Sequence, residues 1–278
     1  MWNAIPTRPQ WQFSNARWQT ATRARLGLLR APAGATCQLP KGDEGEETVC
    51  GKVLDQHVVH PALCDAGATK IRTHNALKFV LAQECRAEGA FVDVECRVPD
   101  LYKRLANGEI REAILDLVVE WPCAGRRHLI DVTVRCPHAA RYPNSASKVG
   151  VAAAAGDKDK RDHYGPTVSP FAVESFGHLG EGARMCLVDL AAYASRYGKA
   201  RIGRVVGLDV KKLRLKLEAT LLMQQADHAL MALGTSSPAA LGWVSSSQFR
   251  RSQQERVAPV PVLPLHQGSL VGASAALP

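Results

Sequence analysis

Three strand-like stretches lie in the middle of the chain: the first alternates apolar and polar residues, and the other two are mostly apolar, both patterns typical of β-strands. These stretches run from Ala90 to Val98, from Ala113 to Trp121 and from His128 to Arg135. A fourth candidate strand extends from Val168 to Ser175 and ends just before Gly177. Because alternate residues of a strand share a face, we expect the apolar side chains of these strands to build one core.

Helical periodicity occurs before and after these strands. Apolar residues at three- and four-residue intervals predict a helix over Leu77–Cys85, with Thr73 as its cap and Gly89 at its end. Other helices are expected over residues 16–30, from about 145 to 164, around 187–198 and from about 209 to 233. The order of helix, three strands, helix, strand and further helices predicts an α/β fold, with a mixed sheet flanked by helices.

Changes in composition divide the chain into five segments. We expect an N-terminal linker and helix over residues 1–36, a small zinc knuckle over 37–75, and the α/β core over 76–180. C-terminal helices follow over 181–234. The last segment, 235–278, is rich in Ser, Ala and Pro without periodicity, which predicts a disordered tail.

The chain has 278 residues and a formal net charge of +9, which favours a polyanionic partner such as nucleic acid. No apolar run reaches membrane-spanning length and no secretory signal is recognisable, so we expect no membrane partner and a nuclear or otherwise intracellular location. Eight cysteines are too few for a disulfide scaffold. In a reducing compartment, metal binding or burial is the better expectation for them.

Cysteine and histidine residues gather before the first long helix. Cys50, His60 and Cys64 lie within fifteen residues among turn residues, and Cys37 lies upstream across an acidic loop. Zinc takes four such ligands in a tetrahedron, so these four residues form a candidate zinc site. His57 could replace either Cys37 or His60, and ordinary burial of these residues is the alternative interpretation.

Two acidic residues interrupt the apolar strands: Asp116 lies between leucines, and Asp131 between Ile130 and Val132. A carboxylate inside a sheet is costly unless it is paired or bound to a metal. Neighbouring strands could bring the two together around Mg²⁺, which could then activate water for phosphodiester hydrolysis. The alternative is a structural pairing of these aspartates with Arg111, Arg126 or Arg135, and Glu84 or Glu95 could supply a third carboxylate.

The helix expected after the third strand carries Lys158, Lys160, Arg161 and Tyr164. Lys160 and Arg161 lie four and three residues before Tyr164, so each shares a helix face with it. A cation there could neutralise the charge that develops on a phosphate.

Several of these motifs resemble the C-terminal region of site-specific non-LTR retrotransposon proteins. Cys50-Gly51-Lys52-Val53-Leu54-Asp55, then His60, Cys64 and Thr73-His74-Asn75, is similar to their C-G-x-x-L-D…H…C…R-H-N pattern. The two acidic strands and the Lys160–Tyr164 segment resemble later motifs, and the resemblance covers roughly residues 4–235. The chain departs from the pattern in having Leu115 for proline, Thr133 for lysine and Thr73 for arginine.

This resemblance implies a restriction-endonuclease-like fold of the PD-(D/E)XK class, preceded by a zinc knuckle. It implies a DNA endonuclease, dependent on Mg²⁺ or Mn²⁺, that nicks a double-stranded target, with the RNA of the element as a further partner. Asp116 and Asp131 would bind the metal, Lys160 or else Lys158 would stabilise the phosphate, and Tyr164 would orient it. Zn²⁺ would be held by Cys37, Cys50, His60 and Cys64.

Two other classes of function fit the same sequence. The chain could be a catalytically inactive, zinc-stabilised remnant that binds nucleic acid through its knuckle and basic helices. It could also be a structural protein stapled by zinc, without a nucleic-acid role. The geometry of Asp116 and Asp131 discriminates between enzyme and binder, since a shared metal requires their carboxylates to lie together.

Overall fold

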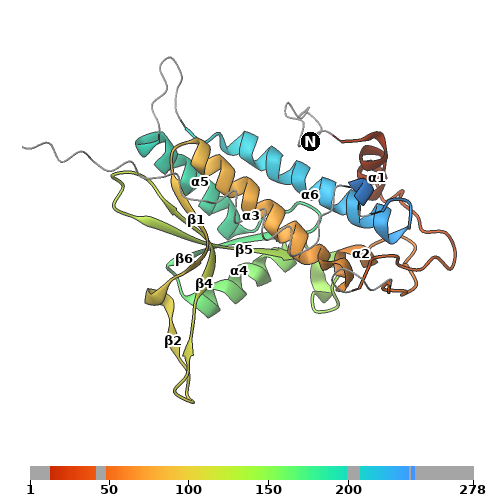
Figure 1. Cartoon of the computed structure of the whole chain (residues 1–278), viewed down its shortest axis with the longest axis horizontal. Coiled ribbons are helices and arrows are strands. Elements are labelled where there is room, and N and C mark those ends of the chain that lie inside the picture. The colour runs from red at the N-terminus through yellow and green to blue at the C-terminus, as the bar shows by residue number, and fades with distance from the viewer. Residues whose placement is uncertain (1–12, 42–47, 199–206, 238, 242–278) are drawn as a thin grey trace, which may run out of the picture.

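The central element of the chain is a four-stranded sheet. A computed structural model describes residues 13–41, 48–198, 207–237 and 239–241 (Figure 1). The strands lie in the order β1-β4-β5-β6 and comprise β1 (Phe91–Arg97), β4 (Ile114–Glu120), β5 (Arg127–Arg135) and β6 (Val168–Glu174). β4 is antiparallel to both its neighbours, and β6 is parallel to β5. The four predicted strands and the mixed sheet are thus confirmed.

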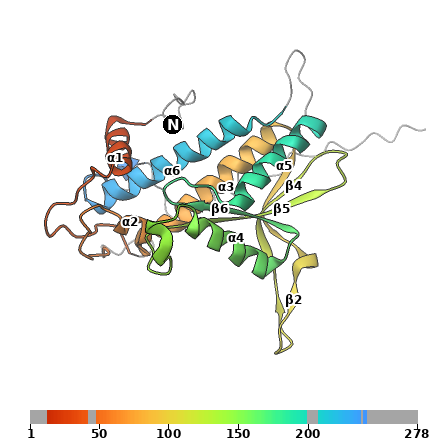
Figure 2. The ribbon, with the colours of Figure 1, turned by 180° about the vertical axis from the view of Figure 1, so that it is seen from behind.

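Helices cover both faces of this sheet. On one face lie α3 (Thr69–Ala87), α5 (Glu181–Tyr197) and α6 (Val210–Ala232), while α4 (Val151–Tyr164) lies on the other (Figures 1 and 2). The three helices and the sheet bury one large apolar core, in which the aliphatic side chains of all three helices meet Ile130, Val132 and Phe171. The core therefore uses the apolar face of each strand, as the alternation predicts.

α4 lies very close to the sheet because Gly156 has no side chain. A Cβ at this position would come within 3.0 Å of Thr133 Cγ2 and 3.1 Å of Ala172 Cβ. These two contacts lie on β5 and β6, so Gly156 sets the distance between α4 and both strands.

Two buried acidic side chains organise the helices around β6. The Glu174 carboxylate accepts hydrogen bonds from Ala152 N at 3.0 Å and Ala153 N at 3.3 Å, in the first turn of α4. Asp157 Oδ2 accepts from Gly182 N at 2.8 Å, in the first turn of α5. Both carboxylates satisfy amide groups that a helix leaves unpaired at its N-terminus, so they have structural explanations.

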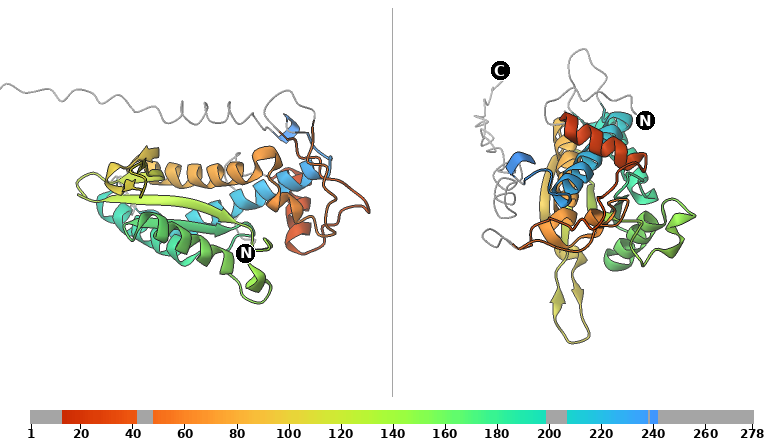
Figure 3. Two further views of the ribbon diagram at one scale, coloured as in Figure 1. Left: turned by 90° about the horizontal axis from the view of Figure 1, so that it is seen from below. Right: turned by 90° about the vertical axis from the view of Figure 1, so that its right-hand side faces the viewer.

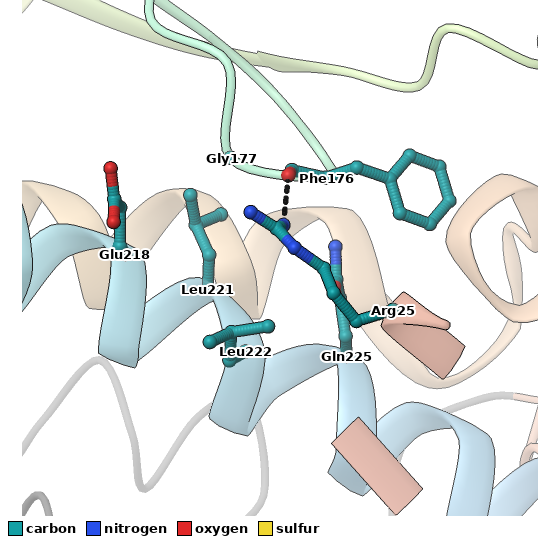
Figure 4. Close-up of a pocket in the computed structure, with 7 residues that line it drawn as sticks. All are labelled: Arg25, Phe176, Gly177, Glu218, Leu221, Leu222 and Gln225. Carbon is teal, nitrogen blue, oxygen red and sulfur yellow. Dashed lines mark hydrogen bonds between the residues drawn. The ribbon is translucent and has the colours of Figure 1, made fainter. Parts of the chain in front are cut away.

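The N-terminal helix α1 (Asn15–Arg25) packs against α6 at the end of the molecule opposite the sheet (Figure 1). Arg17 Nε lies 2.6 Å from Asp227 Oδ1, and Arg17 Nη2 donates to the other oxygen at 3.0 Å. Arg25 donates to the carbonyl oxygen of Phe176, just after β6, beside a small cavity (Figure 4). The helix ends sooner than the sequence predicts because Gly27 adopts a left-handed conformation, with φ of 65°.

A hairpin that the sequence analysis did not predict projects from the sheet between β1 and β4 (Figures 1 and 3). It consists of β2 (Lys103–Arg104) and β3 (Ile110–Arg111), which are antiparallel. Asn107-Gly108 lies at its turn, where Gly108 has a φ of 85°. This dipeptide is a strong hairpin signal, so the sequence did carry the information.

Two helix starts differ from expectation. α3 begins at Thr69, so Thr73 lies in its second turn and donates to Thr69 O at 3.0 Å, and it is not the cap. α4 begins at Val151, after a 3-10 helix at Pro143–Ala146 and a left-handed Gly150. The other short helices are α2 (His60–Leu63) and 3-10 turns at Ala66–Ala68, Pro99–Leu101 and Ala239–Leu241.

The ends of the chain were expected to be a linker and a disordered tail. Residues 1–12 and 242–278 lie outside the described residues. The expected helix over about 209–233 is α6, which ends before the left-handed Gly234. No helix in the described part of the chain is both long and apolar enough to cross a membrane.

Candidate metal centres

A cysteine–histidine cluster formed by Cys37, Cys50, His60 and Cys64 lies beside the end of α6. The ligand atoms of these four residues all lie within 4.8 Å of one another. A tetrahedral zinc with bonds of about 2.0–2.3 Å needs its ligands roughly 3.3–3.8 Å apart, so a small contraction would complete the shell. These are the four residues that the sequence analysis selected, and together they could hold a zinc ion.

The long gap between Cys37 and Cys50 is spanned by an antiparallel chain pairing. Isolated bridges join Thr36 to Val53 and Pro40 to Val49. Between them, Cys37 N donates to Lys52 O at 2.8 Å, and Cys50 N donates to Leu39 O at 2.8 Å. The two cysteines are therefore brought together by strand pairing, which explains how ligands thirteen residues apart can share one site.

The other two ligands bracket the single turn of α2. His60 is its first residue and Cys64 follows its last, so the pair lies four residues apart on one helix face. The Asp55 carboxylate accepts hydrogen bonds from the amide groups of His57, Val59 and His60, at 3.0, 3.0 and 2.6 Å, and so fixes the start of this turn. His60 joins the cluster, which resolves the alternative in which His57 was the ligand.

The cluster is partly enclosed by its own segment and by α6. Cys37 and Cys64 are buried, and Leu39, Leu54 and Met231 pack beside them. Cys50 Sγ lies 3.4 Å from His60 Nε2. Burial, together with the neighbouring thiols, raises the pKa of Cys37 to about 12. A bound metal ion would instead lower the pKa of these thiols, because its positive charge stabilises the thiolate form directly.

A second group of residues, which we name the carboxylate row, crosses three adjacent strands. Glu95 falls between the paired residues Val94↔Leu117 and Cys96↔Leu115, which places it opposite Asp116. The pairing Leu117↔Ile130, continued by one residue, places Asp116 opposite Asp131. The register of the strands therefore aligns Glu95, Asp116 and Asp131 in a row across the middle of the sheet.

Asp116 is held by three groups. Its Oδ2 atom accepts a hydrogen bond from Val132 N at 2.7 Å and contacts His74 Nε2 at 2.9 Å. Lys78 Nζ lies 3.6 Å from Oδ1. Burial alone would raise the pKa of Asp116, but the hydrogen bond and charge of His74 hold it well below its usual range.

Asp131 and Asp116 share a hydrogen bond, and Lys160 Nζ on α4 lies 2.6 Å from Asp131 Oδ2. Burial, followed by the hydrogen bond and charge of Asp116, raises the pKa of Asp131 to about 7 despite Lys160. Of the two carboxyl groups, Asp131 is therefore the one that takes up a proton more readily. Two adjacent carboxylates share a proton in this way when no metal ion separates their charges.

Glu95 contributes a third carboxylate from β1. Lys78 Nζ lies 2.9 Å from Glu95 Oε1, so this buried lysine bridges Glu95 and Asp116. Glu95 has a φ of 54°, a left-handed conformation that is strained for a residue with a side chain. Glu84, the other candidate for a third carboxylate, pairs with Lys216 on α6 and lies outside the row.

The α4 side chains divide between the row and solvent. Lys160 reaches Asp131, and its Nζ lies 5.9 Å from the centre of the Tyr164 ring. Tyr164 donates its hydroxyl hydrogen to Ile114 O at 3.3 Å, and burial with the charge of Asp131 raises its pKa to about 12. Lys158 instead pairs with Asp162 on the exposed side of the helix. The structure thus brings Lys160 and Tyr164, but not Lys158, to the row.

The arginines considered as structural partners of the aspartates make other contacts. Arg135 binds Thr133 Oγ1 at 3.0 Å and Asp159 Oδ2 at 2.9 Å, and Arg126 stacks over the ring of Tyr193. Arg111 lies near His163 and Tyr164: burial and then the charge of Arg111 lower the pKa of His163, and the same charge partly opposes the raised pKa of Tyr164.

Sequence reasoning did not assign His74 and Lys78 to this site. They lie four residues apart on α3, so both face the row. The signal that could have identified them is the presence of a lysine and a histidine on the apolar side of a helix. The chain matches no protein-family model and no curated protein.

Proposed function

We propose that the carboxylate row binds a divalent metal ion and hydrolyses phosphodiester bonds of DNA. The observation that carries this proposal is the meeting of Asp116 and Asp131 on adjacent strands, with Lys160 Nζ at 2.6 Å from Asp131 Oδ2. Paired carboxylates can hold a metal ion that activates water, and a lysine beside them can stabilise charge on a phosphate, so the arrangement suits metal-dependent hydrolysis of phosphate esters. The order of α3, three core strands, α4 and β6 also fits the restriction-endonuclease-like fold that the sequence resembles.

The donor atoms of the row suit Mg²⁺ or Mn²⁺. All are carboxylate oxygens, and Mg²⁺ is commonly held by one or two carboxylates together with water and substrate phosphate. Burial and, to a smaller extent, the neighbouring Asp116 raise the pKa of Asp131, and a dication between the two carboxyl groups would remove their repulsion. A bound metal ion would supply an activated water and neutralise charge on the phosphate.

The side chains around the row have distinct tasks in this proposal. Val132 N and His74 fix the orientation of Asp116, so they are positioning groups. Lys160 places a positive charge where the phosphate gains negative charge in the transition state. Tyr164 remains a neutral phenol, since its pKa is raised to about 12, and it can orient the phosphate through its hydroxyl group.

Zinc in the cysteine–histidine cluster has a structural role in this account. Its four protein ligands leave no open coordination position, which is typical of structural zinc. The cluster packs against Met231 and Ala232 at the end of α6, and α6 also packs against α3, which carries His74. Zinc would therefore fix the end of the helix that supports α3.

DNA binding in this proposal rests on positive charge. The helix α6 carries Lys211, Lys212, Arg214 and Lys216, but the last three form ion pairs with Asp209, Glu218 and Glu84. This cluster therefore contributes less net charge than the sequence indicates. Affinity should still fall with salt, because each phosphate contact releases a counterion.

A second candidate function is nucleic-acid binding without catalysis. The carboxylates of the row already have Lys78, Lys160 and His74 as neighbours, and these contacts can stabilise the row without a metal ion. A remnant of an enzyme would retain this arrangement. The two functions differ in whether the protein cleaves DNA.

The experiment that tests the proposal is nicking of a supercoiled plasmid, with purified protein and with Mg²⁺ added or omitted. We expect open circular product only with Mg²⁺, and almost none from the Asp116→Asn variant. Asp116→Asn should still bind DNA, because it removes a negative charge from the surface that meets phosphate. DNA binding with no nicking by the unaltered protein would favour the second function.

A further inference from the structure

A cavity of about 300 Å³ lies between the end of β5, the first turns of α3 and the middle of α6. Its charged lining residues are Lys70, Arg135 and Arg141, and among the residues that the structure describes no aspartate or glutamate lines it. We name it the cationic cavity. A cavity whose charged residues are all positive attracts anions, and the low dielectric constant of the surrounding protein strengthens this attraction. The lining therefore indicates an anionic ligand.

Neutral hydrogen-bonding groups complete this lining. Ser175 and Gln225 line the cavity, and Gln225 Nε2 is buried with no hydrogen-bond acceptor among the described residues. A buried donor without an acceptor costs free energy, and a ligand that brings oxygen atoms would remove that cost. Phosphate carries oxygen acceptors and negative charge together, and it therefore matches both parts of the lining.

The cations of the cavity remain available to a ligand. Lys70 contacts Asp65 Oδ1 at 2.6 Å and Arg135 contacts Asp159 Oδ2 at 2.9 Å, but both acidic side chains are exposed and lie outside the lining. Exposed ion pairs are worth about 0–1 kcal/mol, so a phosphate can displace or share them. Arg141 makes a stacking contact with the ring of Tyr142, 4.8 Å from its centre.

The cavity has a fixed position relative to the carboxylate row. Arg135, which lines the cavity, follows Asp131 by four residues along β5, which corresponds to about 13 Å at roughly 3.3 Å per residue. A nucleic-acid strand whose scissile phosphate lies at Asp131 could therefore place a flanking phosphate in the cavity. This link between the two sites rests on the proposed nuclease function.

We propose that the cationic cavity binds a phosphate group, and that the backbone of the nucleic-acid strand at the carboxylate row supplies it. Arg141 and Lys70, which are exposed, provide positive charge, and Gln225 donates a hydrogen bond inside the cavity. The cavity would then fix the register of the strand relative to Asp131.

The test combines two measurements on the full chain. The first is the salt dependence of binding to a duplex oligonucleotide, without added divalent metal, for the unaltered protein and Arg141→Ala. Loss of one phosphate contact lowers the slope of log affinity against log salt by about 0.9 for duplex DNA. Arg184→Ala is the matched control, because it removes an exposed arginine on α5, and it should leave the slope unchanged.

The second measurement is calorimetric titration with inorganic phosphate. The unaltered protein should bind phosphate, and Ser175→Asp, which places a negative charge in the lining, should abolish this binding while the protein stays folded by circular dichroism. Phosphate binding with an unchanged DNA salt slope for Arg141→Ala would support a phosphate site but overturn the nucleic-acid backbone as its source. Absence of phosphate binding together with an unchanged slope would overturn the whole proposal. Neither measurement depends on nicking, so failure of the nuclease function would be seen separately.

Discussion

Lys160 Nζ on α4 lies 2.6 Å from Asp131 Oδ2 on β5, and the contact depends on how closely the helix approaches the sheet. Gly156 lies one helical turn before Lys160, where a Cβ would meet Thr133 at 3.0 Å. Residues four apart share a helix face. Gly156, which sets the distance between α4 and the sheet, and Lys160, which contacts Asp131, therefore lie on the same face of α4.

Gly156→Ala should therefore destabilise the fold, although alanine is the better helix former by about 1 kcal/mol. The added methyl group must displace α4 from Thr133 and Ala172, and such overpacking costs about 1–3 kcal/mol. Urea denaturation measures the change in the free energy of unfolding. Gly207→Ala is the control, since its Cβ would meet nothing closer than 3.8 Å and should change stability by less than about 0.5 kcal/mol.

Lys160→Ala and Lys158→Ala should have different effects on nicking. Lys160 contacts Asp131, while Lys158 pairs with Asp162 at the exposed side of α4. Loss of a charge that stabilises the transition state lowers the rate by about 10²–10³, and affinity for DNA should fall much less. Single-turnover rates and binding constants for both variants make the comparison. Equal effects of the two variants would show that Lys160 has no special role.

Removal of zinc should affect two regions that are distant in the sequence. The purified protein should contain about one equivalent of zinc, and Cys64→Ser should lower this content, while exposed Cys123→Ser should not. Leu39 and Leu54 pack against Met231, so chelation should increase hydrogen exchange both around the cluster and at the end of α6. Elemental analysis of fresh protein without zinc would contradict this prediction.

His228 should make the fold sensitive to acid. Burial, with a smaller effect of the Arg72 charge, lowers the pKa of His228 to about 3, whereas an unfolded histidine has its ordinary value of about 6.5. As pH falls below about 6.5 the unfolded state takes up a proton and the folded state does not, so stability falls by up to about 1.4 kcal/mol per pH unit. This loss continues until the pH approaches about 3.

The measurement is the free energy of unfolding at several pH values for the unaltered protein and His228→Gln. The stability difference between the two should shrink as pH falls, because glutamine has no proton to take up. Acid effects on the cysteine–histidine cluster are common to both proteins and cancel in the difference. A pH-independent difference would mean that His228 is not held neutral in the fold.

Much of the fold could be predicted because its strands are short apolar or alternating runs and its helices are periodic. The bounds that were wrong depend on contacts between distant residues. α3 starts at Thr69, whose hydroxyl donates to Cys64 O at 3.1 Å, and no local signal marks this position. The β2–β3 hairpin was missed although Asn107-Gly108 signalled its turn.

In the candidate sites too, the residue types could be predicted from the sequence, whereas most of the contacts between distant residues could not. The four cysteine and histidine ligands could be selected from residue type, although the strand pairing that joins Cys37 to Cys50 is not visible in their spacing. The pairing of Asp116 with Asp131 was anticipated from two acidic strands. Glu95 was one of two candidates for a third carboxylate, but the choice between it and Glu84 depends on strand register, and the contact of Lys78 with Glu95 could not be anticipated.

The measurement that tests the account most directly is the Mg²⁺-dependent rate at which Asp131→Asn nicks supercoiled plasmid. Asparagine keeps the size of the side chain but removes the charge that a metal ion and Lys160 would share. We predict a rate at least about 100-fold below that of the unaltered protein, with DNA binding intact. Asp100→Asn, an exposed aspartate paired with Arg127, is the control and should nick normally. An Asp131→Asn protein that nicks at the unaltered rate, in a preparation free of contaminating nuclease, would contradict the central claim.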